Sequence, residues 1–97
     1  SGPIILMGDF NSLPNSRPVH TILKELKDSF NISLNKPKGP KGTYNGFNED
    51  QPIEKRIDYI YLKNIDVLNH EHIDDRLENK NHISDHLPVI VDLIIKH

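Results

Sequence analysis

The stretch IILMGDFNS, residues 4–12, passes from four apolar residues to a glycine, an acid, an aromatic residue, an amide and a hydroxyl. The isoleucine-rich run at residues 4–7 is short and does not alternate, which is typical of a strand buried on both faces. Gly8 lets the backbone turn closely where the run ends. If the strand continues past Gly8, its two-residue period points Asp9 and Asn11 to the same side. The stretch therefore predicts a strand that delivers two polar side chains to one site.

Further along the chain, the sequence predicts one helix and three more strands. The helix is expected over residues 17–27, because apolar residues recur there at helical spacing, namely Val19, Ile22, Leu23 and Leu26. The strands are expected at residues 57–62, 67–73 and 87–95, and the first two of them as an antiparallel hairpin. Residues 29–54 are expected to form a long irregular connection, which in a small domain is usually functional or disordered.

The composition limits the classes of protein that fit. A chain of 97 residues suits one domain of modest size, and its net charge of -2 argues against DNA binding through bulk charge. An enzyme that grips one phosphodiester locally remains compatible with this charge. The chain has no cysteine, so it has no disulfides or thiolate metal sites. It has no apolar run of about 18 residues to span a membrane, and the lack of a visible signal peptide slightly favours the cytoplasm.

Three polar pairs lie where predicted strands begin or end: Asp9 with Asn11, Arg56 with Asp58, and Asp85 with His86. Such positions are rigid, so their side chains can converge on one site. A carboxylate such as Asp9 can orient or deprotonate water, and donors such as Asn11 and His86 can stabilise charge on phosphoryl oxygens. Asp85 can bind a divalent cation, and Asp58 can orient a histidine. These residue types together favour hydrolysis of a phosphate ester.

Each pair also has a purely structural interpretation. Asp9 and Asn11 can be turn residues at a strand end, and Asp58 can be a strand charge paired with Arg56. The Asp-His pair at residues 85–86 can be ordinary loop polarity. A hydrolase triad within residues 84–86 is rejected, because adjacent residues rarely form a triad and the chain has no G-x-S-x-G motif. The presence of all three pairs in one short chain favours the catalytic interpretation.

Four segments resemble the closing motifs of the endonuclease/exonuclease/phosphatase family, whose fold is DNase I-like. They are ILMGDFNS (5–12), GTYNGF (42–47), RIDYIYL (56–62) and SDHLPVIVDL (84–93). Any one of them is a weak signal, but four in this order are specific and span nearly the whole chain. The resemblance implies an α+β fold, the C-terminal half of a four-layer α/β sandwich, with one mixed sheet and a covering helix. Residues 1–97 would then be the C-terminal portion of the domain.

The resemblance also implies roles for individual residues. Asp9 would orient or deprotonate the attacking water, and Asn11 would hydrogen-bond the scissile phosphate. Asp58 would pair with the catalytic histidine, His86, and Asp85 would belong to the metal site. Two further residues would bind substrate, with a third at the substrate mouth: Thr43, Asn45 and Phe47. The implied cofactor is Mg²⁺ or Mn²⁺. The implied partner is a phosphate-ester substrate, with nucleic acid among the candidates.

The resemblance further implies that this chain corresponds to the second half of the family's domain, and that the first half would carry the asparagine and glutamate of the main metal site. We therefore expect a metal-dependent phosphoesterase in the parent protein, with the fragment alone inactive. The alternative is a non-catalytic half-domain that acts in assembly or binding. The missing half would leave a sheet face uncovered, so the isolated chain is expected to self-associate through it. The apolar residues of concern are Leu6, Ile60, Leu62, Val89, Val91 and Leu93.

Other histidines and lysines have plainer interpretations. His70 and His72 share one face of a predicted strand, as a metal pair would, but they lack a third ligand nearby. We expect both to be exposed strand residues. Lys36, Lys38 and Lys41 could steer a polyanion, although a solvated loop is the favoured interpretation.

Overall fold

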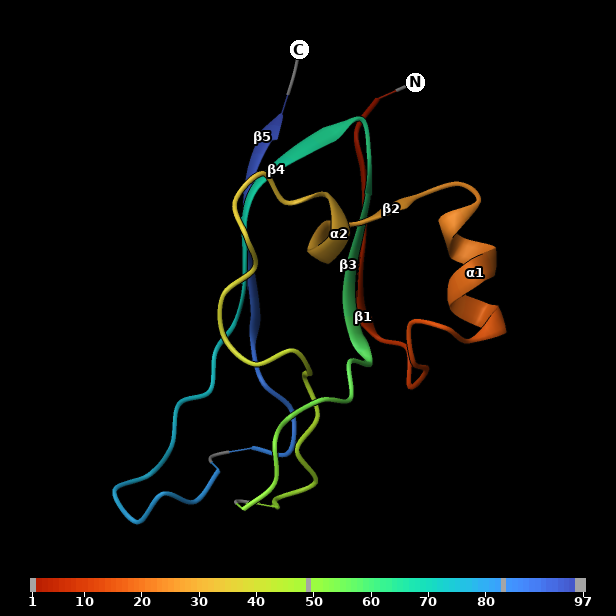
Figure 1. Cartoon of the computed structure of the whole chain (residues 1–97). Coiled ribbons are helices and arrows are strands. Elements are labelled where there is room, and N and C mark those ends of the chain that lie inside the picture. Colours follow the sequence, from red (N-terminus) through yellow and green to blue (C-terminus); the bar gives the residue numbers. More distant parts are fainter. Residues whose placement is uncertain (1, 49, 83, 96–97) are drawn as a thin grey trace.

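The structure is a computed structural model that describes residues 2–48, 50–82 and 84–95. Its elements are β1 (Ile4–Asp9), α1 (Arg17–Leu23), β2 (Lys27–Asp28), α2 (Ser29–Ile32), β3 (Asp58–Lys63), β4 (Ile65–His72) and β5 (Val89–Ile95). They form two sheets (Figure 1), one with the strand order β1-β3-β2 and the other made of β4 and β5. All of these strand pairs are antiparallel. The expected α+β class is confirmed.

The expectation of one mixed sheet is wrong, because the chain changes sheets between β3 and β4. β3 pairs with β1 and β2, whereas β4 pairs with β5, so the expected hairpin of residues 57–62 and 67–73 does not form. The corner is Asn64, which has a φ of 61°, a left-handed conformation that asparagine tolerates better than most residues. β4 begins directly after it, at Ile65. The two strands thus contribute to opposite sides of one core.

The main core lies between the two sheets. Its buried residues come from β3 and β4, and they are Ile60, Leu62, Ile65 and Val67. Half-buried side chains from α2 and β5 pack against them, namely Ile32, Val89, Val91 and Leu93. Each sheet therefore covers one face of the other, as in other two-sheet sandwiches. The face of β3 that was expected to be bare is covered within this chain.

The other face of β3 is covered by α1, as expected. Val19 of α1 is buried against Tyr59 and Tyr61 of β3, with Phe10, Ile22 and Leu26 half-buried around them. The helix ends at Leu23 rather than at the expected Lys27. The reason is that Lys27 and Asp28 are used as β2, which pairs with β3 opposite Leu62 and Tyr61.

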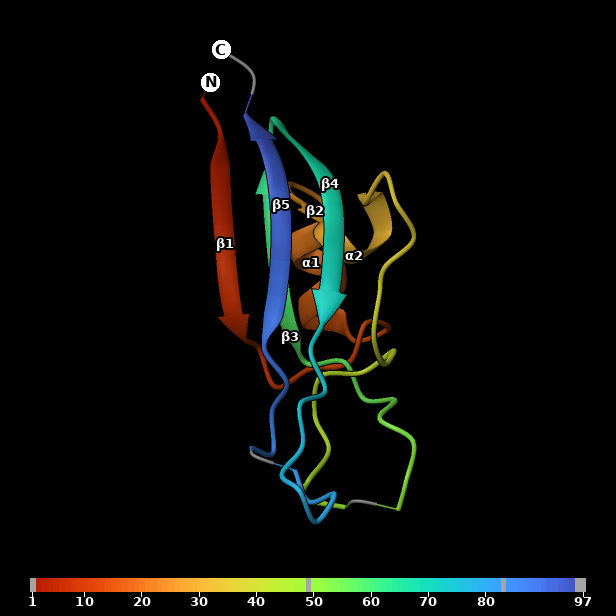
Figure 2. The same cartoon turned by 90° about the vertical axis from the view of Figure 1, so that its left-hand side faces the viewer.

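Exposed apolar residues remain on β1 and β5, which lie at the borders of their sheets (Figure 2). All of β1 is exposed, so the expectation of a strand buried on both faces is wrong for this chain. Met7 is the most exposed residue of this group, at 64%. On β5 the exposed apolar residues are Ile90, Ile94 and Ile95. This surface, rather than the face of β3, is what the chain leaves uncovered.

His70 and His72, which were expected to be exposed, are 2% and 1% exposed. They lie under α2 and the 36–42 segment in one chain of hydrogen bonds. His72 Nδ1 donates to Pro40 O at 2.8 Å, so His72 Nε2 accepts from His70 Nε2 at 2.8 Å. His70 Nδ1 then accepts from Ser29 Oγ at 2.7 Å. Burial lowers the pKa of both rings, that of His70 to about 4, so both are neutral near pH 7.

A buried ion pair lies beside these histidines. Arg56 Nη1 is 2.7 Å from Asp28 Oδ2, and both side chains are almost fully buried. The guanidinium also lies over the rings of Phe30 and Tyr59, at 4.3 and 4.9 Å from their centroids. Arg56 is thus bound to Asp28, and its pairing with Asp58, considered from the sequence, is not observed.

Candidate active site

Three polar side chains meet where β1 ends and β3 begins. Asp9 and Asp58 are Cα partners across these two strands. His86, just before β5, contacts both carboxylates: its Nδ1 lies 2.8 Å from Asp58 Oδ2 and its Nε2 lies 3.7 Å from Asp9 Oδ2. The antiparallel register thus places two acids side by side, and the chain that leads into the second sheet brings the histidine to them.

The protonation state of His86 follows from these contacts. Its Nδ1–H donates to Asp58, so Nε2 is the ring atom that can gain or lose a proton toward Asp9. The hydrogen bond to Asp58 raises the pKa of His86 above its usual value, and the charges of Asp58, Asp9 and Asp85 raise it further, while burial opposes them. The rings of Tyr44 and His86 pack edge to face, with 5.2 Å between their centroids. We did not select Tyr44 from the sequence, although it lies within the GTYNGF segment.

Asn11 lies beside Asp9 through a turn and not through strand alternation. β1 ends at Asp9, and Asn11 has a φ of 51°. Its backbone N–H donates to Asp9 Oδ1 at 2.8 Å, the hydrogen bond of an Asx-turn. The turn fixes one oxygen of Asp9 and leaves Oδ2 toward His86. The expectation that period-two geometry aligns Asp9 and Asn11 is wrong, but the two residues are still adjacent.

The side chains of Thr43 and Asn45, which were expected to bind substrate, hydrogen-bond backbone groups elsewhere in this chain. Thr43 is fully buried, and its hydroxyl accepts from the backbone N–H of Ile57 and of Asp58, each at 3.1 Å. Asn45 Nδ2 donates to Ser84 O at 2.8 Å, and its Oδ1 accepts from the N–H of Phe47 at 2.6 Å. A direct substrate contact by either side chain has no support in this geometry. Phe47 itself is about half exposed, and its expected place at the substrate mouth stays a prediction.

Asp85 does not join the central group. Among the described residues, the side chains that could hold a metal ion together are Asp9, Asp58 and His86, whose ligand atoms lie within 4.8 Å of one another. Asp85 is half-buried, and its backbone carbonyl accepts from the N–H of Asn45 at 2.8 Å. Its expected place as a metal ligand stays a prediction, and within this chain it acts on the site through its charge.

The donor set fits part of a magnesium site. Mg²⁺ in enzymes is usually held by one or two carboxylates, with waters and substrate phosphate completing the octahedron. The Asp9 side chain is 47% exposed and offers Oδ2, whereas Oδ2 of Asp58 already accepts from His86. Asp9 is therefore the residue of this group best placed to bind a hard cation.

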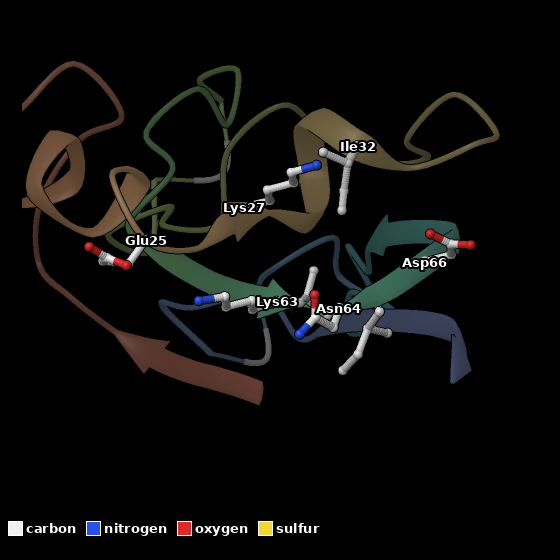
Figure 3. Close-up of a pocket in the computed structure, with 8 residues that line it drawn as sticks. Glu25, Lys27, Ile32, Lys63, Asn64 and Asp66 are labelled. Carbon is white, nitrogen blue, oxygen red and sulfur yellow. The ribbon is translucent and has the colours of Figure 1, made fainter. Parts of the chain in front are cut away.

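A hollow of about 590 Å³ lies away from these groups. It is at the far end of β3, between α2 and the corner at Asn64, and Lys27, Lys63 and Asp66 are among the side chains that surround it (Figure 3). A smaller hollow of about 190 Å³ opens directly against Asp9 and Asp58, beside Met7 and Val89. The chemistry of the side chains, rather than the size of a hollow, marks the site.

The sequence matches the endonuclease/exonuclease/phosphatase family over residues 1–86. The chain therefore belongs to this family, as its four motifs predicted. A search among curated proteins gives no significant match. The described part of the chain contains no helix with the length and apolarity needed to cross a bilayer.

Solved structures with the same fold support this assignment. A conserved protein of unknown function from Enterococcus faecalis V583 has a TM-score of 0.88 and 30% identity, over 97% of this chain and 37% of that chain. A mannosyl-6-phosphatase from Bacteroides thetaiotaomicron VPI-5482 has a TM-score of 0.82 and 27% identity, over 96% and 38%. An endonuclease/exonuclease/phosphatase family protein from Bacteroides thetaiotaomicron has a TM-score of 0.84 and 29% identity, over 97% and 36%. The chain spans less than two fifths of each of these structures.

Proposed function

We propose that this chain supplies the catalytic Asp9, Asp58 and His86 of a metal-dependent phosphoesterase that hydrolyses a phosphomonoester or a phosphodiester. The observation that carries the proposal is the contact of one imidazole with two carboxylates, 2.8 Å from Asp58 and 3.7 Å from Asp9. Family membership supports a hydrolase of phosphate esters in general. Because the solved relatives are much longer than this chain, we also propose that residues 1–97 work as the C-terminal portion of a larger domain.

The side chains have separate tasks in this mechanism. Asp58 holds Nδ1–H of His86, which fixes the ring and leaves Nε2 to face the reaction. The raised pKa of His86 favours the imidazolium form, whose Nε2–H donates to a phosphoryl oxygen as negative charge develops there. Asp9 orients a water or accepts its proton, and Asn11 donates to the phosphate. A bound Mg²⁺ or Mn²⁺, held in part by Asp9, would supply further stabilisation of negative charge.

One solved relative suggests where to begin with substrates. The Bacteroides thetaiotaomicron protein named above is a mannosyl-6-phosphatase, so sugar phosphates are the first phosphomonoesters to assay with this protein. Nucleic acids are the first phosphodiesters, since nucleases are part of the family named by the motif match. The net charge of -2 argues against duplex DNA among the nucleic acid substrates.

The test compares the full-length protein with the purified 97-residue chain. We expect the full-length protein to hydrolyse phosphate esters with Mg²⁺ or Mn²⁺ and to lose activity in a chelator, with recovery when metal is restored. We expect the 97-residue chain alone to be inactive, because it supplies only part of a metal shell. Robust metal-dependent turnover by the chain alone would contradict its assignment as a portion of a domain. A full-length protein without any such activity would favour the alternative, a non-catalytic half-domain in assembly or binding.

A further inference from the structure

The segment Thr43–Asn45 joins the two parts of the chain that carry Asp58 and His86. On one side it is bonded to the residues that lead into β3. The Thr43 N–H donates to Lys55 O at 2.8 Å, and the Thr43 hydroxyl accepts from the N–H groups of Ile57 and Asp58 at 3.1 Å each. One buried oxygen thus fixes the backbone of Asp58 itself.

On its other side the same segment is bonded to the loop that carries His86. Leu87 N–H donates to Thr43 O at 2.7 Å. The backbone N–H of Asn45 donates to Asp85 O, and Asn45 Nδ2 donates to Ser84 O, both at 2.8 Å. Hydrogen bonds from Thr43 and Asn45 of the GTYNGF motif therefore hold residues on both sides of His86.

We propose that Thr43 and Asn45 are positioning residues that set the Asp58–His86 hydrogen bond, Thr43 through the backbone of Asp58 and Asn45 through the loop of His86. Neither contacts substrate. The catalytic consequence rests on the proposed function, whereas the effect on the hydrogen bond itself does not.

The physical argument is one of distance and sheet partnership. Asp58 and His86 are 28 positions apart. Asp58 is the first residue of β3, whereas His86 lies just before β5, which belongs to the other sheet. A 2.8 Å hydrogen bond between them survives only if both backbones are held within a fraction of an ångström, about 0.5 Å for a productive site. β3 and β5 share no strand pairing in the described structure, so their own ladders do not supply this constraint. The hydrogen bonds of Thr43 and Asn45 do supply this constraint. Those of Thr43 hold the backbone at Asp58, and those of Asn45 hold the loop that carries His86.

The first experiment replaces Thr43 in the full-length protein. Thr43→Val keeps the shape of the side chain but removes the acceptor, and Thr43→Ser restores the acceptor. Thr21→Val is the matched control, because Thr21 lies on the exposed side of α1 and its hydroxyl donates to Arg17 O of the same helix. We expect Thr43→Val to lower kcat about 10- to 100-fold with KM nearly unchanged, because misplaced catalytic groups lose rate more than binding. Thr43→Ser should recover most of the rate, and Thr21→Val should keep all of it.

A spectroscopic measurement separates positioning from general destabilisation. The Nδ1–H proton of His86, hydrogen-bonded to Asp58, should give a downfield proton resonance that is assigned by its loss in His86→Asn. We expect this resonance to weaken or disappear in Thr43→Val and to remain in Thr43→Ser. Asn45→Asp, which keeps the acceptor for Phe47 but loses the donor to Ser84, should weaken it as well. This last variant keeps the proposal testable if Thr43→Val does not fold.

The outcomes have distinct meanings. A raised KM with unchanged kcat in Thr43→Val or Asn45→Asp would overturn the proposal in favour of substrate binding. A lower melting temperature with an intact resonance and normal kcat would reduce both residues to ordinary structural ones and overturn it too. If the protein shows no phosphoesterase activity but the resonance responds as expected, the proposed function fails and the positioning role stands.

Discussion

Asp9 and Asp58 occupy the same rung of the β1–β3 ladder, and the imidazole of His86 contacts both of them. Like charges directly opposite each other across two strands are destabilising. Here the raised pKa of His86 brings a positive charge to the two carboxylates, which offsets part of their repulsion. Clusters with such perturbed protonation are typical of functional sites. The arrangement explains why a strand ends in an acid directly opposite another acid.

The pairing of Asp58 with His86 predicts non-additive losses of activity. In the full-length protein, His86→Ala should lower kcat by about 10²- to 10⁴-fold, the usual contribution of a proton-transfer group. Asp58→Asn should lower it substantially as well, because the ring loses its orienting partner. The double variant should be little worse than His86→Ala alone, since the two residues act as one unit. Steady-state kinetics of the four proteins is the measurement, and multiplicative losses would show that Asp58 does not act through His86.

Substitution of Asp9 should separate activity from stability. Asp9→Asn keeps the oxygen that accepts from the Asn11 N–H but removes the charge. The side chain is about half exposed, so we expect a change of less than about 1 kcal/mol in the free energy of unfolding. Turnover should fall at least about 100-fold, because the group that handles the attacking water is lost. Asp50→Asn, at an exposed position of the 42–54 segment, is the control, and full activity of Asp9→Asn would remove Asp9 from the mechanism.

The buried pair of Asp28 and Arg56 predicts a large stability effect. Asp28→Asn keeps the acceptor for the Phe30 N–H but leaves the Arg56 guanidinium buried without its counter-ion. We expect a loss of about 3–5 kcal/mol in the free energy of unfolding, measured by urea denaturation. Asp74→Asn disturbs a more exposed pair with Arg76 and should cost less than about 1 kcal/mol. Equal losses in the free energy of unfolding would mean that water solvates the Arg56 guanidinium in Asp28→Asn.

The buried histidines predict a loss of stability in mild acid. Burial, helped by the charges of the neighbouring ring and of Arg56, holds the pKa of His70 near 4, below its usual 6.5, and burial also lowers that of His72. Between pH 6.5 and about 4 the unfolded chain therefore binds protons that the folded chain does not. Stability should fall as the pH falls, by up to about 1.4 kcal/mol per pH unit for each histidine.

Urea denaturation at a series of pH values checks this effect, together with proton NMR titration of His70. His86 acts in the opposite sense, because its pKa is raised and its contribution to stability is present at low pH and lost as the pH rises through that pKa. The series is therefore best recorded in a His86→Asn background. His20→Asn, on the exposed side of α1, is the control. A free energy of unfolding that does not change between pH 6.5 and 4 would show that the folded chain takes up protons on His70 and His72 as readily as the unfolded chain does.

Exposed apolar residues on β1 and β5 predict self-association of the isolated chain. An unpaired strand border with apolar side chains readily pairs with another chain, and a lysine placed on it suppresses that pairing. Sedimentation equilibrium of the purified 97-residue chain should show dimers that Met7→Lys converts to monomers. Leu34→Lys, at a residue 78% exposed in a loop, is the matched control and should leave the dimers unchanged. A chain that stays monomeric at all concentrations and melts cooperatively would show that the exposed apolar residues of β1 and β5 do not drive association.

Several features of this protein could be predicted from the sequence because they depend on neighbours along the chain. The run at residues 4–7 and the alternation of residues 57–62 predicted β1 and β3 nearly at their observed bounds. The helical spacing of Val19 and Ile22 predicted the buried face of α1, and the polar residues at strand ends predicted that Asp9, Asp58 and His86 lie together. A local pattern suffices in these cases, since backbone periodicity and turn chemistry act over a few residues.

Other features were decided only by the tertiary structure. The alternating pattern of β3 did not reveal that its partners are β1 and β2, because pairing depends on which distant segments share a core. The burial of His70 and His72 depends on α2 and Pro40, which cover them. Ser29 of α2, 41 positions before His70, and Pro40, 32 positions before His72, hydrogen-bond their ring nitrogens. The burial of Thr43 was likewise not evident from its motif, since it depends on the hydroxyl accepting hydrogen bonds from the N–H groups of Ile57 and Asp58, where β3 begins. A sequence pattern records which face of an element is apolar, but only the packed chain decides which surface covers that face and which polar groups find partners there.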